Sequence, residues 1–421
     1  MEKKSEKFIG FIAILVILIA AKFWLKTDIL FFRLLIGTGI GYALARAYTG
    51  FAGSVNRAYR TGSTKLMRTL MFMFFITAVL TAGLLLGNDP ASFNLWVKPI
   101  NLGVIFGGFL FGFGMSLSVC CASGVLTDLP MGFPRAFTTL IFFGLGVFLG
   151  FPVQNTASWV QESWFSSYIG YRTMGGVFLP DFFQGDGFEG YLGGLIALGA
   201  LCVIFTALSY LYERYQVKNN KYTGLEIERI QENAESMDFK NFKLFSADTY
   251  YHFFEKPWTL KQGAVALAII FTLLMAVTRA GWGASQPYGI WFGKFLMIFG
   301  ISAETLSSFT KMSAEVFNTP FFEHQISVQN FGIITGAIIY LLTAGKFSKM
   351  FTSELSITKK QAAIYALGGL TMGFGTRLAN GCNVGALYTP IANFSLSGWL
   401  FLVFMIVGGI ISNKFNEKIA G

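Results

Sequence analysis

The stretch Gly373–Leu387, GFGTRLANGCNVGAL, places one thiol, Cys382, among small and turn-forming residues in an otherwise apolar chain. The segment Gly112–Leu126, GFGMSLSVCCASGVL, repeats it. Without a gap, the two copies share Gly-Phe-Gly, Leu, Cys, Gly and Leu at the same offsets, and a Gly-Gly pair precedes each copy by the same distance. This alignment pairs Cys121 with Cys382. We therefore expect a duplicated thiol-bearing segment to organise the fold.

The composition is that of a membrane protein. Of 421 residues, 54% are hydrophobic and 13% are charged, whereas a soluble domain carries about 25% charged residues. Glycine, at 48 residues, is more frequent in transmembrane than in soluble helices. The sequence predicts an all-α polytopic membrane protein. The net charge of +10 arises in short loops, where Lys and Arg set the topology, so no nucleic-acid partner is expected.

Cysteine and histidine usage does not favour a disulfide framework or a metal site. Four cysteines without a CxxC motif are too few for a disulfide scaffold. His252 and His324 lie far apart in the sequence, so a Cys/His metal site is poorly supported. We expect neither a metal nor another cofactor.

Apolar segments recur along the chain at a length suited to a bilayer, which takes about 20 residues to span. The candidate spans are 8–25, 29–48, 67–87, 101–118, 135–153, 190–212, 261–280, 289–303, 329–345, 361–378 and 396–413.

These spans suggest four parts. Residues 1–28 form an extra N-terminal transmembrane helix; a basic start and an apolar run also fit a signal peptide, but the many later spans favour an uncleaved helix. Residues 29–212 form a first membrane repeat with an extra helix, and residues 258–421 form a second repeat. Between them, 213–257 has eight acidic and seven basic residues. It is interpreted as a solvated cytoplasmic linker with some helix, or alternatively as a docking surface for a soluble partner.

Lysine and arginine placement predicts the orientation. Three lysines in the first seven residues place the N-terminus inside, and the acidic loop 154–189 falls outside. Six spans then return the linker to the cytoplasm. Lysines after residue 345 also favour the inside, so 281–328 must begin and end outside, either as two crossings or as a re-entrant excursion.

This topology inverts the two thiol-bearing copies. The span before Cys121 runs inward from outside, whereas the span before Cys382 runs outward. A second pair of segments, Arg46–Ser54 and Arg279–Ser285, supports two related halves with an insertion in the second. Inverted repeats with re-entrant or broken helices are a transporter architecture, with the substrate site near the midplane between the repeats.

The glycine-rich segments suit a path for an anion. Each Gly costs a helix about 1 kcal/mol relative to Ala, so a break is expected near each thiol. The next half-helix would then begin with free N–H groups, which attract anions. The alternative is close helix packing through small residues. Non-helical backbone at membrane depth is tolerated where it is buried in protein or lines a cavity.

Polar neighbours strengthen the case for Cys382. Amides flank this thiol, and buried polar groups need partners; the alternative is a small buried hydrophobe. Arg377, inside a span, is costly unless it faces a cavity or a partner, and it either attracts an anion or snorkels as a paired helix-end arginine. The candidate pathway residues are Cys382, Cys121, Cys120, Arg377, Asn380, Asn383, Gly381, Gly385 and Gly124.

The repeated GFGxxLxxxCxxGxL pattern resembles the YeeE/YedE family of bacterial inner-membrane sulfur transporters, over about 29–153 and 261–413. The second copy looks especially close to the selenium-associated YedE branch. The resemblance implies an hourglass of two inverted halves, with short re-entrant helices meeting centrally, in the bacterial plasma membrane. It also offers a soluble cytoplasmic sulfur-carrier protein as a candidate partner.

Family members take up thiosulfate, and their pathway cysteines hold it transiently through S–H···S contacts. By position, the resemblance assigns this role to Cys121 and Cys382. The family pattern usually has a further Cys after an Arg-containing segment, where this chain has Gly50. A three-thiol relay is therefore missing one member, so either two thiols suffice with help from Cys120, or the substrate differs.

The favoured function is a transporter, not an enzyme, that imports a small sulfur-containing anion. A selenium-compound transporter with the same fold is the main alternative. A membrane sulfurtransferase would need a base or cation to activate Cys382, and no His lies nearby in the sequence. A structural or partner-anchoring membrane protein is the remaining alternative.

Overall fold

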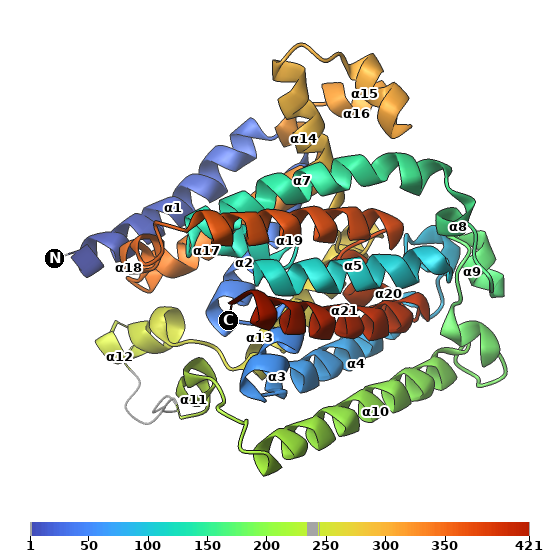
Figure 1. Ribbon diagram of the computed structural model, residues 1–421, viewed down its shortest axis with the longest axis horizontal. Helices are drawn as coiled ribbons and strands as arrows, with labels where there is room; N and C mark the ends of the chain where they lie inside the picture. The colour runs from blue at the N-terminus through green and yellow to red at the C-terminus, as the bar shows by residue number, and fades with distance from the viewer. Residues whose placement is uncertain (1, 234–242, 244, 421) are drawn as a thin grey trace.

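The computed structural model describes residues 2–233, 243 and 245–420, and in this part of the chain it contains helices and no β-strands (Figure 1). Eight of the described helices are long and apolar enough to cross a membrane. This confirms the all-α polytopic membrane class. The eight are α1 (Glu2–Trp24), α2 (Asp28–Ala47), α4 (Lys65–Leu85), α7 (Phe133–Thr156), α10 (Tyr191–Lys218), α13 (Leu260–Thr278), α17 (Gln325–Thr343) and α21 (Ser397–Ala420).

Two further helices occupy the centre of the helix stack. They are α5 (Leu102–Ser118) and α19 (Lys359–Leu378), which match the expected spans 101–118 and 361–378. Both are rich in glycine, and the two helices pack against each other. In Figure 1 they lie between α7 and α21, so other helices cover them where lipid would otherwise be. Shelter from lipid explains how α19 tolerates Arg377 in its last turn.

The long helices pack in matching pairs. Helix α2 packs on α17 and α13 packs on α4, while α7 packs on α19 and α21 packs on α5. Exchanging α2 with α13, α4 with α17, α5 with α19 and α7 with α21 converts each of these packings into another of the four. Glycines set the close approach: a Cβ atom on Gly112 would lie 2.0 Å from the Met405 carbonyl oxygen, and one on Gly373 would lie 2.3 Å from that of Phe143.

The region 281–328 is an excursion and not two crossings. Its longest helix, α14 (Gln286–Ile298), has 13 residues, which is about 20 Å of helix against an apolar bilayer core of about 30 Å. The expected span at 289–303 is therefore too short to cross. Helices α14 to α16 project from one side of the helix stack in Figure 1. The remaining elements of this region are α15 (Ala303–Thr310), α16 (Ala314–Asn318) and η4 (Phe321–Glu323).

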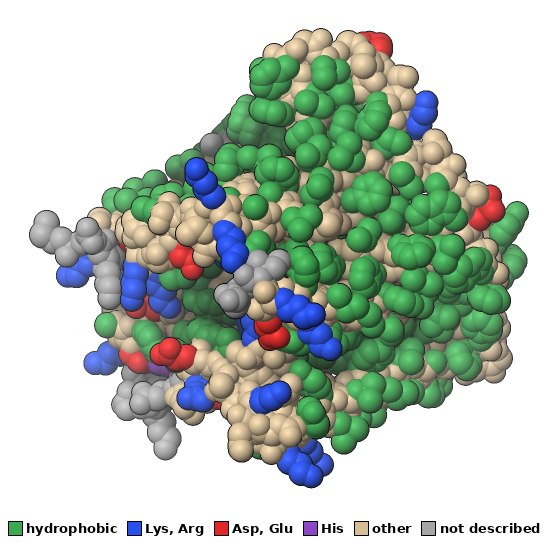
Figure 2. Space-filling model, viewed as in Figure 1, with side chains coloured by type: hydrophobic (Ala, Val, Ile, Leu, Met, Phe, Trp, Pro, Cys, Tyr) green, Lys and Arg blue, Asp and Glu red, His purple; other side chains and the backbone are tan. Residues whose placement is uncertain are grey.

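The two ends of the stack differ in charge. Both termini lie at the same end as α11 (Glu226–Glu232), α12 (Ala247–Tyr250) and α18 (Phe347–Thr352) (Figure 1). Figure 2 shows lysines and arginines gathered at this end and hydrophobic side chains over most of the remaining visible surface. The other end holds α8 (Ser158–Gln161) and α9 (Tyr168–Arg172). Shorter elements elsewhere are α3 (Gly53–Thr61), α6 (Gly124–Asp128), α20 (Thr389–Ala392), η1 (Pro90–Ser92), η2 (Leu179–Phe182), η3 (Tyr251–Glu255) and η5 (Asn383–Tyr388).

The linker packs on the membrane domain more closely than a solvated linker would. Helix α10 continues to Lys218, beyond the expected boundary at 213. Gln231 of α11 is buried, and its side-chain amide donates to the carbonyl oxygens of Ala47 (2.8 Å) and Trp258 (2.7 Å). Arg46 donates to linker carbonyls in the same way, including that of His252 (2.8 Å). Linker residues 234–242 and 244 lie outside the described residues.

Gly112→Ala should destabilise the protein by about 1–3 kcal/mol, because the added methyl group overpacks the contact with α21. Gly83→Ala on α4 is the matched control, since a Cβ there meets nothing within 4 Å. It should be neutral or stabilising, because Ala is the better helix former. Thermal unfolding in detergent, followed by tryptophan fluorescence, measures both. Equal effects of the two substitutions on the unfolding temperature would contradict the close packing of α5 against α21 at Gly112.

Candidate substrate pathway

Each of the two repeat thiols lies in a helix break. Helix α5 ends at Ser118, and α6 begins after a turn in which Val119 has a φ of 58°. Helix α19 ends at Leu378, and η5 begins after a turn in which Asn380 has a φ of 56°. Asn tolerates this left-handed conformation well, whereas it is unusual for a β-branched residue such as Val119. The expected broken helices at both cysteines are confirmed.

The break at Cys382 is held by a lysine. Lys98, in the segment between α4 and α5, donates from Nζ to the carbonyl oxygen of Gly385 (2.5 Å) and to that of Asn380. A Cβ atom on Gly381 would lie 2.7 Å from Lys98 Nζ, so the glycine makes room for the ammonium group. Cys382 has no exposed surface, and Lys98 is 4% exposed. The lysine thus spans the turn that carries the thiol.

Arg377 lies on the other side of the same break and is also 4% exposed. Its guanidinium donates to the hydroxyls of Ser285 (2.6 Å) and Thr376 (3.2 Å) and to the side-chain carbonyl of Gln154 (3.3 Å). Gln154 in turn donates to Oδ1 of Asn380 (2.6 Å). The guanidinium also lies 5.4 Å from the centre of a phenylalanine ring. Every one of these partners is uncharged.

The side chains of Lys98 and Arg377 are therefore buried near one thiol, and burial lowers the pKa of Lys98 to about 7. Lys98 and Arg377 both lie within electrostatic range of Cys382. Among the residues that the structure describes, no carboxylate forms a salt bridge with either cation. Burying an uncompensated charge is expensive. We define Lys98, Arg377 and Cys382 as the outer cluster; its charge and its donors suit a small anion.

Asn383 connects this break to the other half of the protein. Its amide nitrogen donates to the sulfur of Met115 on α5 (3.2 Å), and its side-chain oxygen is buried without a hydrogen-bond partner. Buried polar atoms are rarely left unsatisfied. Asn383 therefore adds an unused polar atom close to Cys382.

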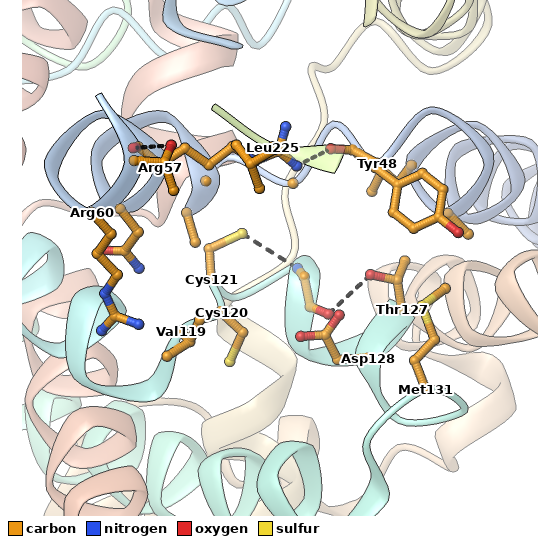
Figure 3. Close-up of a pocket in the computed structure, with 18 residues that line it drawn as sticks. Tyr48, Arg57, Arg60, Val119, Cys120, Cys121, Thr127, Asp128, Met131 and Leu225 are labelled. Carbon is orange, nitrogen blue, oxygen red and sulfur yellow. Dashed lines mark hydrogen bonds between the residues drawn. The ribbon is translucent and has the colours of Figure 1, made fainter. Parts of the chain in front are cut away.

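The second thiol borders a pocket of about 340 Å³, which we call the inner pocket. Cys120, Cys121 and Gly124 all line it, together with Gly50. Figure 3 shows Cys121 joined to the backbone of Gly124, whose N–H donates to Sγ (3.3 Å). This N–H was expected to be free for an anion, but the thiol already occupies it. The pocket lies beside α3 at the end that carries both termini.

Charged side chains line the inner pocket as well. Asp128 pairs with Arg135 (3.1 Å). Arg57 pairs with Glu228 of the linker (3.2 Å). Arg60 donates to the side-chain oxygen of Asn413 (3.1 Å), and no carboxylate partner is found for it in the described part of the chain. The pocket is therefore positively charged on balance.

A tyrosine from the excursion contacts the loop that carries Cys121. Tyr288 on α14 is 1% exposed, and its hydroxyl donates to the carbonyl oxygen of Ala122, next to Cys121. It lies within electrostatic range of both Cys121 and Cys382. Neither Cys121 nor Cys382 has exposed surface.

The structure thus groups the predicted residues in two places. Cys382, Arg377, Asn380, Gly381, Asn383 and Gly385 meet at the outer cluster, whereas Cys120, Cys121 and Gly124 meet at the inner pocket. Sequence reasoning missed Lys98, Tyr288, Arg57 and Arg60. Lys98 had one usable signal: it is a lone lysine directly before a predicted span, in a loop predicted to lie outside, where lysines are under-represented.

Gly381→Ala should lower the thermal unfolding temperature of the purified protein, because its Cβ would clash with the backbone of Gly385 and with Lys98 Nζ. Gly385→Ala is the milder comparison, since its Cβ would lie 3.2 Å from the nearest atom, on the Trp96 ring. Overpacking of this kind costs about 1–3 kcal/mol. An unfolding temperature for Gly381→Ala at or above that of Gly385→Ala would contradict the lysine-filled turn.

Comparison with known proteins agrees with this architecture. A thiosulfate transporter, TsuA, from Spirochaeta thermophila is 26% identical over 378 residues, covering 89% of this chain and 95% of its own. A probable transporter, YedE, from Salmonella typhimurium is 28% identical over 162 residues, 38% of each chain. Escherichia coli TsuA, also named a thiosulfate transporter, is 28% identical over 158 residues, 37% of this chain and 38% of its own. The Sulphur transport family model matches residues 46–411, and the chain belongs to this family.

Proposed function

We propose that the protein imports a small divalent sulfur oxyanion, with thiosulfate as the first candidate. The observation that carries the proposal is the outer cluster, in which Lys98 and Arg377 are buried beside Cys382 and form no salt bridge with any carboxylate among the described residues. A dianion would match their two charges. The Sulphur transport family and the name of the Spirochaeta thermophila relative support the same substrate class.

The outer cluster suits both ends of thiosulfate. The hard oxygens would accept hydrogen bonds from the lysine and arginine, which form stronger bonds to anions than neutral donors do. The soft terminal sulfur would rest on the Cys382 thiol, which is a weak S–H donor. An uncharged thiol is required, because a thiolate would repel the anion.

We propose that the substrate then passes Tyr288 and reaches Cys121 in the inner pocket. A hydrogen bond from Tyr288 to the Cys121 loop supports a gate at this point. The matching helix packings support two inverted halves, each of which supplies one thiol. At Gly50, where family members have a further cysteine, a Cβ atom would meet nothing within 4 Å. Cys120 lines the same pocket and would supply a third thiol.

The proposal includes an orientation. The positive-inside rule places the end with both termini and the linker in the cytoplasm, which is supported by the lysines and arginines in Figure 2. A soluble sulfur-carrier protein would then meet the transporter at this end. No covalent step at either cysteine is part of the proposal, so the protein acts as a transporter and not as an enzyme.

Uptake of labelled thiosulfate into proteoliposomes tests the proposal. Lys98→Met and Arg377→Gln should each reduce uptake about 10- to 100-fold, because a hydrogen bond to a charged group contributes about 1.5–3 kcal/mol. Lys414→Met is the matched control: this lysine is exposed on α21 and should be dispensable. Cys382→Ser should reduce uptake as well, since it removes the soft contact.

Uptake by Lys98→Met and Arg377→Gln equal to that of the wild type would contradict the proposal that the outer cluster binds the substrate. Wild-type uptake of selenite without uptake of thiosulfate would instead identify a selenium-compound transporter. A persulfide on Cys382 after exposure to thiosulfate would indicate a sulfurtransferase.

A further inference from the structure

The linker places a buried carboxylate beside the inner pocket. Glu228 of α11 is 2% exposed. One carboxylate oxygen pairs with Arg57 (3.2 Å), and the other accepts a hydrogen bond from the hydroxyl of Ser63 (2.6 Å). Nothing in the sequence pattern of the linker indicated that one of its acids would be buried against the membrane domain.

Arg57 belongs both to the pocket and to this ion pair. It lines the inner pocket, and its other terminal nitrogen donates to the carbonyl oxygen of Tyr48 (2.6 Å), as the dashed line in Figure 3 shows. Leu225, the residue before α11, also lines the pocket. Backbone hydrogen bonds to Thr61 from Thr223 (2.9 Å) and Gly224 hold this part of the linker in place. The linker thus forms part of the pocket wall.

The charges in the pocket leave room for an anion. Arg60 lines the inner pocket, and its guanidinium donates to the amide oxygen of Asn413. The pocket's own acid, Asp128, is occupied by Arg135. If the Glu228 carboxylate withdrew, Arg57, like Arg60, would have no carboxylate partner in the part of the chain that the structure describes. Glu228 itself lines a neighbouring pocket and reaches the inner pocket only through its ion pair with Arg57, so it controls how much of the Arg57 charge is available there.

We propose that the inner pocket is a second anion-binding site, for a small divalent oxyanion, and that Glu228 is its built-in competitor. Arg60 and Arg57 are the cations of this site. With Glu228 on Arg57, the linker lies against the pocket and anion binding is weak; an arriving dianion displaces the carboxylate and loosens the linker. The identity of the anion rests on the proposed function, whereas the competition rests on the contacts of Glu228.

Protection of the pocket thiols measures the binding. The full chain with Cys202→Ser and Cys382→Ser retains Cys120 and Cys121, and iodoacetamide reports their accessibility. Sulfate is the probe, because it is a small divalent oxyanion that, unlike thiosulfate, does not react with iodoacetamide; the half-protecting concentration is the readout. Glu228→Gln should lower this concentration about tenfold, because Arg57 loses its charged competitor. Arg60→Gln should raise it about tenfold, because the pocket loses a cation.

Glu232→Gln is the matched control on the same helix. Glu232 pairs with Lys65 (2.7 Å) at the surface and does not line the inner pocket, so this variant should behave as the parent. Should Glu228→Gln fail to fold, Arg60→Gln still decides, because Arg60 is exposed and its loss leaves the linker contacts intact.

Half-protecting concentrations equal to the parent's in both Glu228→Gln and Arg60→Gln would overturn the inference, as would a lack of protection by sulfate in the parent. Neither result depends on transport. Failure of wild-type thiosulfate uptake would remove the proposed function and its substrate, while the order of the half-protecting concentrations would still decide whether Glu228 competes with an anion.

Discussion

The buried charges of Lys98 and Arg377 are the constraint on which the outer site depends. Two cations buried in the protein carry a desolvation cost that neutral partners offset only in part. In this protein the partners are backbone carbonyls, hydroxyls and one amide. The arrangement is unfavourable for stability alone, and a dianion that shares both cations would relieve it. Cys382 lies where such an anion would present its sulfur.

The surrounding helices make this arrangement possible. Glycines on α5 and α19 bring these helices close together and against α21 and α7, so that both helix breaks lie inside the protein and away from lipid. The excursion 281–328 contributes Ser285, which accepts from Arg377, and Tyr288, which donates to the carbonyl oxygen of Ala122 beside Cys121. The linker contributes Glu228, which pairs with Arg57 at the inner pocket. Elements that lie outside the duplicated segments therefore shape both sites.

The sequence predicted more of the scaffold than of the site. Hydropathy located ten of the eleven expected spans as long helices, because lipid demands a run of apolar residues. The thiols were found because the repeat marked them, and Arg377 was found because a charge inside a span is costly. Lys98 was missed, since its role depends on a contact across 282 residues with Asn380. Glu228 was missed because burial of a single acid inside a polar segment has no periodic signal. The span at 289–303 was wrong because apolar composition does not distinguish a short excursion from a crossing.

The central claim is that a dianion binds between Lys98 and Arg377 with its sulfur on Cys382. A structure of the full chain determined with thiosulfate bound tests it most directly. The account predicts an anion whose oxygens lie within hydrogen-bond distance of Lys98 Nζ and the Arg377 guanidinium, and whose terminal sulfur contacts Cys382. Thiosulfate bound elsewhere, with both cations still on their neutral partners, would contradict it.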